Sequence, residues 1–592
     1  MRSRRSLVAL LAVVIAALVL PAAAAAKPKA ADTVFTGGYV YTVDAGSRVA
    51  QAVAVRDGAI VYVGKDAGAK AFIGRHTRVV KLHGKMMLPG FIDSHAHASF
   101  QVQTLYSAML YGLKTVDEYV AAVKEFADAH KDMPAIRGQG WSNTVVPGIG
   151  PLATDLDRAV SDRPASIMSE DGHSYWVNSR ALADAGITGK TPDPEDGVIE
   201  RLPGTQQTDP PYGTPSGTLR ETAAALVNDL IPDFTVDQYK DGIRSYQTDV
   251  AAPLGITGVF DPLLHAGSNA VQAYEELAQA GQLHVRVRAA LEITPADKVD
   301  EWIASAEAEK AKHTTPMFQT DAVKVFADGV VEGHTAYLDE PYADALAYKG
   351  DASYRGEPIW QPQAMDEAFA ALDKAGFLIH THAIGDAACS EVLDALAYAR
   401  EKNGSYDWRP GITHIQLVDP GDFARFGSLG VTAVPDPYWF IKDDYYTYLQ
   451  VPYLGQPRAD DEYPMKSFFD AGALVASASD YPVTIPPDPL DGIAVGVARW
   501  APEYVYEYPA WPDPEGMLWP EQRVTVAQMI RSFTYNGARA YFLEKTTGSI
   551  EVGKSADLVV VSKNLFKVKP TAIFDAKVLY TMGRGKVLFD EL

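Results

Sequence analysis

Two histidines near the start of the chain stand in a spacing that suits metal binding. His95 and His97 follow the apolar run 86–93 directly and are separated by one residue. In an extended segment, side chains two residues apart lie on the same face, so both imidazoles would lie side by side at the end of a strand. Such a pair supplies half of the ligands of a zinc-type site. A single motif of two histidines is weak evidence for a metal site. The interpretation therefore depends on whether the rest of the chain supplies the other ligands.

Short apolar runs recur through the middle of the chain, and helical patterns such as 365–375 and 389–402 separate most of them. The runs are 86–93, 256–260, 285–291, 322–326, 377–382, 412–416, 431–434 and 474–479. Eight strands that alternate with helices are the elements of a (β/α)8 barrel. We therefore expect an α/β fold, with a TIM-like barrel over residues 86–544.

Residues that bind metals or transfer protons stand at the ends of several of these runs. Besides the histidine pair, they are Lys324, His382, His414 and Asp480. The ends of barrel strands are where an active site forms, and four histidines with a carboxylate suit zinc or a similar divalent metal. Two simpler readings remain open. Lys324 could form an ion pair with Asp328 or Asp321, and Asp480 could cap the following helix.

Both ends of the chain have the pattern of β structure. Residues 33–43 and 51–63 alternate in polarity around the turn pair Asp57-Gly58, and 557–561 and 578–589 form a similar set. We expect one small β-sandwich domain built from residues 32–85 and 545–592.

A long insertion separates the first two barrel runs. It contains Pro- and Gly-rich pieces at 191–197 and 202–217 and helical stretches at 116–130 and 236–250. A normal crossover connection is far shorter. Residues 101–250 are therefore expected to form a subdomain inserted in the barrel that covers its mouth.

The net charge and the N-terminal sequence limit the partners and the cellular compartment that we expect. With 75 acidic and 53 basic residues, the formal net charge is −22, which disfavours nucleic acid and anionic membranes as partners. A basic start, an apolar stretch at 7–20 and small residues to Ala26 predict a signal peptide over residues 1–26, with an uncleaved anchor as the alternative. Cys389 is the only cysteine, which excludes an intrachain disulfide. We expect a periplasmic or secreted protein.

Taken together, the motifs resemble the amidohydrolase superfamily, and within it the amidohydrolase family 3 branch of metal-dependent hydrolases. The segments that carry the resemblance are 90–97, the Lys324 segment with Asp328-Gly329, 382–386, 479–483 and 548–558, with 171–174 and 177–179 in the insertion. The similarity covers essentially the whole mature chain.

The resemblance implies a site for one or two divalent ions, with zinc as the expected metal. His95 and His97 would bind the more buried ion, and His382 and His414 the second. Lys324 would bridge the two as a carbamate formed with carbon dioxide, because an ammonium group has no lone pair to give. Burial would lower its pKa and expose the nucleophilic amine.

The resemblance also assigns the proton transfer. Asp480 would bind the first ion, act as general base toward a metal-activated water and then protonate the leaving amine. Members of the family often have Glu before the sixth-strand histidine, where this chain has Thr413, so the surroundings of His414 stay open. His380 is a spare ligand, a supporting donor or simply a packed histidine.

Four further residues are candidate substrate contacts: His173, Asn178, Glu221 and Trp439. For the first two, ordinary surface positions are an alternative, and for Glu221 a helix cap is one. Trp439 belongs to an aromatic cluster at 438–440, and two more such clusters follow at 445–448 and 504–511. These clusters would line an apolar pocket or simply pack in loops.

The sequence therefore predicts an exported, metal-dependent hydrolase that cleaves a C–N bond other than a peptide bond in a small molecule, such as an amide, formamide or cyclic amide. An ester, lactone or phosphoester hydrolase on the same site is the first alternative. An exported binding or regulatory protein is the second. No phosphate loop, dinucleotide fingerprint or nucleophile elbow stands out, so nucleotide chemistry and serine hydrolysis lack support. A homodimer is compatible with these expectations.

Overall fold

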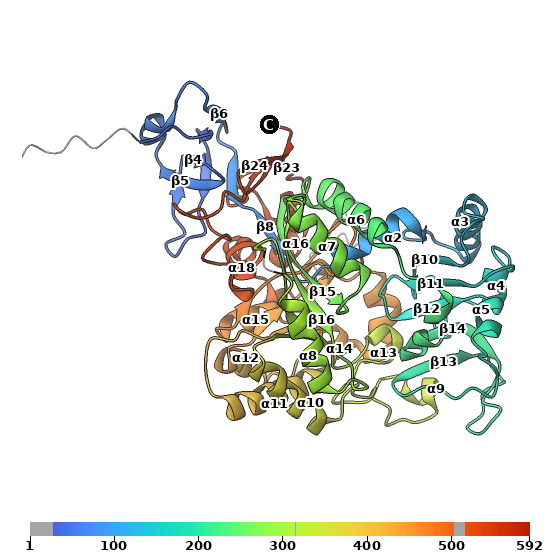
Figure 1. Cartoon of the computed structure of the whole chain (residues 1–592). Coiled ribbons are helices and arrows are strands. Elements are labelled where there is room, and N and C mark those ends of the chain that lie inside the picture. Colours follow the sequence, from blue (N-terminus) through green and yellow to red (C-terminus); the bar gives the residue numbers. More distant parts are fainter. Residues whose placement is uncertain (1–27, 314, 503–515) are drawn as a thin grey trace, which may run out of the picture.

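The centre of the molecule is a parallel sheet that curls round on itself. The computed structural model describes residues 28–313, 315–502 and 516–592 (Figure 1). The sheet's strands, in chain and spatial order, are β8 (Phe91–Asp93), β15 (Ile256–Leu264), β16 (Arg286–Glu292), β17 (Phe318–Phe326), β18 (Leu378–Ala383), β19 (Gly411–His414), β20 (Thr432–Val434) and β21 (Leu474–Val475). A parallel bridge between Ala96 and Tyr481 joins its two edges. The arrangement is that of a TIM-like barrel, with one strand in each predicted run.

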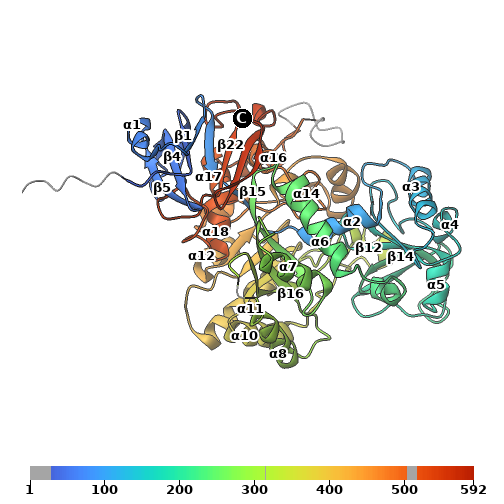
Figure 2. The same cartoon turned by 45° about the horizontal axis from the view of Figure 1, so that its top comes forward.

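Helices follow the strands and cover the outside of the sheet (Figures 1 and 2). They are α6 (Val236–Ser245), α7 (Asn269–Gln279), α8 (Val299–Lys310), α10 (Pro362–Lys374), α11 (Asp386–Asn403), α12 (Phe423–Leu429), α15 (Met465–Asp470) and α16 (Pro489–Ala498). One large apolar core lies between strands and helices. Strand β18 is buried at every position, as expected for a parallel strand covered on both faces.

The first apolar run, expected as one strand, is divided between two sheets. Its first half, β7 (Met86–Pro89), pairs with the C-terminal strand β22 (Leu558–Val561), and its second half is β8. Gly90 lies between them and donates its N–H to the carbonyl of Asp557 at 2.9 Å. A Cβ at this position would lie 2.3 Å from Oγ1 of Thr257, so glycine permits the close approach to β15.

Two sheets built from both chain ends pack beside the barrel, at the upper left in Figure 2. One consists of β5 (Ala59–Gly64), β4 (Ala52–Arg56), β1 (Thr33–Thr36) and β6 (Arg78–Lys81). The other consists of β24 (Lys586–Asp590), β23 (Val578–Gly583), β22, β7, β2 (Tyr39–Tyr41) and β3 (Val49–Ala50). They share an apolar core in which Phe35 meets Tyr580 edge to face. Asp57 and Gly58 both have positive φ, as the predicted β4–β5 turn requires.

The insertion after β8 carries a mixed sheet that the sequence did not predict. In spatial order its strands are β13 (Gly197–Arg201), β14 (Pro215–Glu221), β12 (Ser174–Val177), β11 (Ala165–Ser169), β10 (Ile136–Trp141) and β9 (Ala108–Met109). Helices α3 (Val116–Ala129), α4 (Ala153–Asp157) and α5 (Ser179–Asp184) accompany it. The apolar core of this sheet includes the fully buried Trp141 and Trp176. The insertion stands at the right of the barrel in both views (Figures 1 and 2).

Two predictions fall on parts of the chain that are not described. The expected signal peptide at 1–26 and the aromatic cluster at 504–511 both lie outside the described residues. Among the residues that are described, no helix is both long and apolar enough to cross a membrane.

Candidate metal centre and active site

Three predicted residues converge where the first and last barrel strands meet. The Nε2 atoms of His95 and His97 lie 3.3 and 3.1 Å from the same oxygen, Oδ1 of Asp480. Backbone contacts hold the segments together, because the N–H of Asp480 donates to the carbonyl of His95 at 2.8 Å. Asp93 adds a side-chain clamp by accepting from the Oγ and N–H of Ser479 at 2.5 and 3.1 Å. The predicted histidine pair therefore lies side by side, against the predicted general base.

His380 supports His95 through the opposite ring nitrogen. The Nε2 of His380 lies 2.7 Å from Nδ1 of His95. A hydrogen bond at Nδ1 leaves Nε2 of His95, the atom that faces Asp480, as the nitrogen for a metal. Of the three readings of His380, the contact favours the supporting role.

The second histidine pair is oriented in a similar way. The Nε2 of His382 lies 3.0 Å from the carbonyl oxygen of Gly329, which leaves its Nδ1 for a metal. The Nδ1 of His414 lies 2.8 Å from Oδ2 of Asp436, which leaves its Nε2. The two rings are 4.7 Å apart between centroids, and the ring of His414 is 5.0 Å from that of His95. Strands β18 and β19 therefore place all these imidazoles in one cluster.

Asp436 is a functional residue that the sequence reading missed. It stands two residues after β20, the seventh strand, and its carboxylate is fully buried against His414. It supplies a carboxylate beside His414, which Thr413, the residue before this histidine, does not. The hydroxyl of Thr413 donates to the carbonyl of Val434. A carboxylate close behind a predicted strand end is the signal that could have found it.

Lys324 is buried in β17 without an ion pair among the described residues. Neither expected partner is engaged with it, because Asp328 accepts three backbone N–H groups and Asp321 pairs with Arg288 at 2.8 Å. The ammonium lies 4.4 Å from the ring centre of Phe326. Burial lowers the pKa of Lys324 to about 8, which favours the nucleophilic amine over the ammonium. The ion-pair reading of Lys324 is therefore wrong.

The protonation states suit metal ligands. Burial lowers the pKa of His95, His380 and His382 well below the usual range, and that of His414 to about 3, so the imidazoles are neutral. Burial by itself would raise the pKa of Asp480, but its hydrogen bonds with histidines hold it well below the usual range. Neutral imidazoles and an ionised carboxylate are the forms that bind a divalent ion.

The residues present fit a metal ion. The ligand atoms of His95, His414 and Asp480 lie within 4.8 Å of one another. In addition, Nε2 of His95 is a buried nitrogen without a hydrogen-bond partner of good geometry among the described residues. Two imidazole nitrogens and a carboxylate around one point constitute a donor set for zinc or a similar divalent ion.

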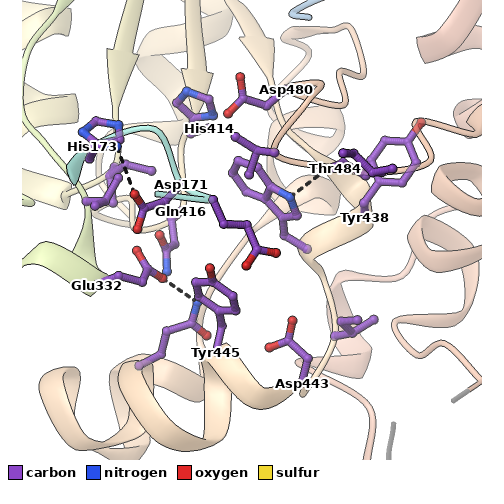
Figure 3. Close-up of a pocket in the computed structure, with 18 of the residues that line it drawn as sticks. Asp171, His173, Glu332, His414, Gln416, Tyr438, Asp443, Tyr445, Asp480 and Thr484 are labelled. Carbon is purple, nitrogen blue, oxygen red and sulfur yellow. Dashed lines mark hydrogen bonds between the residues drawn. The ribbon is translucent and has the colours of Figure 1, made fainter. Parts of the chain in front are cut away.

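A cavity of ≈ 570 Å³ opens onto this centre. His382, His414 and Asp480 line it from the barrel, and His173 lines it from the insertion (Figure 3). Trp439, at the end of the short helix η6 (Pro437–Trp439), also lines it and stacks on His414, with centroids 5.5 Å apart. The structure thus brings the predicted contacts His173 and Trp439 to the cavity.

Glu221 lies behind His173 rather than at the cavity surface. Its Oε2 is 2.9 Å from Nδ1 of His173, and its Oε1 accepts from the hydroxyl of Thr335 at 2.7 Å. Burial by itself would lower the pKa of His173, but the charge of Glu221 raises it to about 9. A Cβ at Gly329 would lie 2.5 Å from Oε1 of Glu221, so the glycine of the Asp328-Gly329 motif makes room for this pair.

Asn178 has to be corrected from a substrate contact to a structural residue. It is fully buried, does not line the cavity and caps α5 by accepting from the N–H of Ala181 at 2.8 Å. Its amide also accepts from Ala165 and donates to the carbonyls of Val160 and Arg163. These bonds satisfy the side chain within the protein.

Comparisons with known proteins show the family of the chain and its fold. The profile of the amidohydrolase family matches residues 78–589. Protein LONG AFTER FAR-RED 3 of Arabidopsis thaliana is 30% identical over 94% of this chain and 92% of its own. The N-substituted formamide deformylase of Arthrobacter pascens is 25% identical over 94% and 98%, respectively. The crystal structure of an uncharacterized metal-dependent hydrolase from Pyrococcus horikoshii shares the fold, with a TM-score of 0.68 and 22% identity over 91% of this chain and 99% of that one.

Proposed function

The chain belongs to the amidohydrolase family of metal-dependent hydrolases, and we propose that it hydrolyses a non-peptide C–N bond in a small molecule. An amide, a formamide or a cyclic amide is the reacting group. The observation that carries the proposal is the meeting of His95, His97 and His414 with Asp480 beside a cavity of ≈ 570 Å³, which His414 and Asp480 line and which is large enough for a small organic molecule. The likeness to a protein named N-substituted formamide deformylase makes formamides the first compounds to test.

The barrel residues hold the metal in this proposal. His95, His97 and Asp480 would bind one ion, and His382 and His414 a second, with zinc favoured by the nitrogen-rich donor set. A bound divalent ion lowers the pKa of a water molecule and polarises the scissile carbonyl.

Lys324 would bridge the two positions as a carbamate. The neutral amine attacks carbon dioxide, a nitrogen–carbon bond forms, and the displaced proton goes to solvent. A pKa of about 8 leaves a substantial fraction of the amine neutral near neutral pH. The carbamate would then supply two oxygens where the unmodified side chain supplies none.

Asp480 and His173 carry the proton and charge movements. Asp480 is ionised and faces the cavity, so it would accept the proton of the attacking water and deliver it to the leaving nitrogen. His173, held in its charged form by Glu221, would stabilise negative charge on the substrate oxygen.

Metal removal and matched substrates test the proposed function. Metal-loaded protein should hydrolyse an N-substituted formamide, lose the activity on chelation and regain it with zinc. The matched formate ester separates C–N from C–O cleavage, and a faster ester reaction would favour the first alternative. No turnover on any amide or ester by metal-loaded protein would favour a binding protein. A His95→Asn/His97→Asn variant that keeps full metal content and activity would refute the site.

The carbamate needs a separate test. Lys324→Ala should lose metal and activity, and added formate or acetate should restore part of the activity by supplying carboxylate oxygens. The matched control is Lys442→Ala, which removes a lysine that pairs with Asp460 instead. An unchanged Lys324→Ala enzyme would exclude the carbamate.

Export is the remaining part of the proposal. It is supported by the basic start, apolar stretch and small residues within 1–26. Expression of the full chain in a bacterial host, followed by fractionation and N-terminal sequencing, should recover protein shortened near Ala26 outside the cytoplasm. Full-length protein in the membrane fraction would favour the anchor.

A further inference from the structure

We propose that the cavity selects substrates that carry a positively charged nitrogen at the end remote from the bond to be cleaved. The inference rests on the proposed function, because it takes the cavity over the metal centre as the substrate site. It extends that function by specifying the charge of the substrate.

The charged residues that line the cavity are strongly one-sided. In addition to Asp480, its walls include the carboxylates Glu170, Asp171, Glu332 and Asp443, whereas no lysine or arginine is among the described residues that line it. In Figure 3, His414 and Asp480 lie at the top of the view, and Glu332, at the left, and Asp443, at the right, lie below them. The acidic end is therefore opposite the reacting end.

Glu332 and Asp443 carry the uncompensated negative charge of this acidic end. The hydrogen bond found for Glu332 is a long one from Gln450, at 3.4 Å, and Asp443 accepts from the backbone N–H of Tyr446 at 3.0 Å. Neither forms an ion pair among the described residues, since the adjacent Lys442 pairs with Asp460 at 2.9 Å. Burial raises the pKa of Glu332 to about 7 and that of Asp443 to about 6, because it disfavours the ionised carboxylates. A bound cation would stabilise these ionised forms.

Asp171 contributes less to the selection of a cation, because its carboxylate oxygens already accept hydrogen bonds within the protein. Its oxygens accept from the side chain of Asn143 at 2.6 Å, the hydroxyl of Ser169 at 2.5 Å and the backbone N–H of His173 at 2.9 Å. The charged His173 ring lies at the same wall. Selection by charge is therefore assigned to Glu332 and Asp443.

Other side chains that line the cavity also suit an organic cation. The aromatic side chains Trp439, Tyr445 and Tyr463 line the cavity, and aromatic faces attract alkylammonium groups. The buried hydroxyl of Tyr111 lines it too and has no hydrogen-bond partner among the described residues. The guanidinium of Arg499 does not line the cavity and forms no ion pair with Glu332 or Asp443; it donates to three backbone carbonyls.

A metal ion would not explain these carboxylates. Among the residues that the structure describes, the one group of three potential ligands within 4.8 Å of one another is His95, His414 and Asp480. The carboxylates Glu332 and Asp443 do not belong to this group. An ammonium group on a larger molecule can interact with both walls.

A matched series of formamides tests the inference. The series is N-[4-(aminomethyl)benzyl]formamide, N-(4-methylbenzyl)formamide and N-(4-carboxybenzyl)formamide, compared by kcat/KM at about pH 8, where both carboxylates are ionised. The ammonium compound should exceed the methyl compound by about tenfold or more, and the carboxylate compound should be the poorest. Equal values for the three compounds would overturn the inference.

Variants locate the selection. Glu332→Gln and Asp443→Asn should each lower the ratio of ammonium to methyl kcat/KM by about fivefold or more. The matched control is Asp444→Asn, which removes the same charge one residue away, where the side chain does not line this cavity. That ratio should stay within about twofold in the control. An equal fall in all three variants would indicate a general field effect and contradict the assignment.

Equilibrium binding separates this inference from the proposed function. Calorimetry of metal-loaded protein with 4-methylbenzylamine and 4-methylbenzyl alcohol requires no turnover. Tighter binding of the amine, weakened by Glu332→Gln, would support the charge selection even if every formamide were inert, a result that would refute the reaction alone. Equal binding of the amine and the alcohol would overturn the inference whatever the reaction is.

Discussion

The histidines of the barrel and the histidine of the insertion meet at one cavity but differ in charge. His95, His382 and His414, on strand ends, are neutral because burial lowers their pKa. His173, on the insertion, is equally enclosed but has a pKa of about 9, because Glu221 lies 2.9 Å away. The same side chain is thus a neutral imidazole, the form that binds metal, on one wall and a cation on the other.

This difference shows how a neighbour decides the role of an imidazole. On the barrel wall, the rings of His382 and His414 donate hydrogen bonds to the carbonyl of Gly329 and the carboxylate of Asp436, and their remaining nitrogens face the cluster. On the insertion wall, a carboxylate behind the ring holds the proton in place. In the proposed mechanism both are used, because one wall would bind metal and the other would stabilise negative charge.

The largest expected effect is on the barrel wall itself. Asp480→Asn keeps the size of the side chain but removes the base, so kcat should fall by about 10²–10⁴-fold. Steady-state kinetics together with metal analysis should separate loss of the base from loss of the ion. Asp470→Asn, an exposed aspartate in a surface pair with Lys466, is the control and should behave as wild type. Wild-type kcat in Asp480→Asn would refute the role of this residue.

A smaller effect is expected for Asp436, which contacts the predicted metal ligand His414. Asp436→Asn disturbs the hydrogen bond that orients His414, so metal affinity should fall by about 10–100-fold. Competition with a chromogenic chelator measures it. Asp460→Asn breaks the surface pair with Lys442 and should leave the affinity unchanged. Equal affinity in both variants would mean that Asp436 does not support a metal ligand.

The insertion wall is tested by pH. In Glu221→Gln the pKa of His173 should fall well below about 9, since burial is then opposed only by the charges of Asp171 and Asp480. Because the folded-state pKa is raised, the pair stabilises the protein fully below pH 6.5 and loses this contribution as pH rises through about 9. The Tm difference between wild type and Glu221→Gln should therefore shrink over that range.

A second buried pair in the insertion provides the control for this pH dependence. Glu200 pairs with Arg220 at 2.6 Å, and arginine does not deprotonate in this range. The Tm cost of Glu200→Gln should accordingly stay constant while that of Glu221→Gln declines. Parallel pH curves for the two variants would contradict a charged His173.

The smallest effect on catalysis is expected at Asn178, which belongs to neither wall. Asn178→Ala removes a helix cap and buried hydrogen bonds, so the free energy of unfolding should fall by about 1–3 kcal/mol. KM should stay within about twofold of wild type, because the side chain does not line the cavity. Trp439→Leu, which changes the cavity lining, is the contrast and should raise KM. A larger KM change in Asn178→Ala would restore it as a substrate contact.

The barrel was predictable from the sequence because parallel strands buried on both faces appear as apolar runs. Each of the eight runs contains a strand of the observed sheet, although 86–93 is divided at Gly90. The six strands of the insertion were not predicted, since they are short and lie among turn-rich segments. For the same reason Asn178 could not be distinguished from a pocket residue.

The sequence by itself determined which residues stand at strand ends, and therefore the set His95, His97, Lys324, His382, His414 and Asp480. This information is local, because a strand end and its side chain are only a few residues apart. Only the tertiary structure decided that Asp436 orients His414, that Glu221 charges His173, and that Glu332 and Asp443 share one end of the cavity. Those contacts join segments far apart in the chain, so they depend on how loops from different strands fold over the barrel.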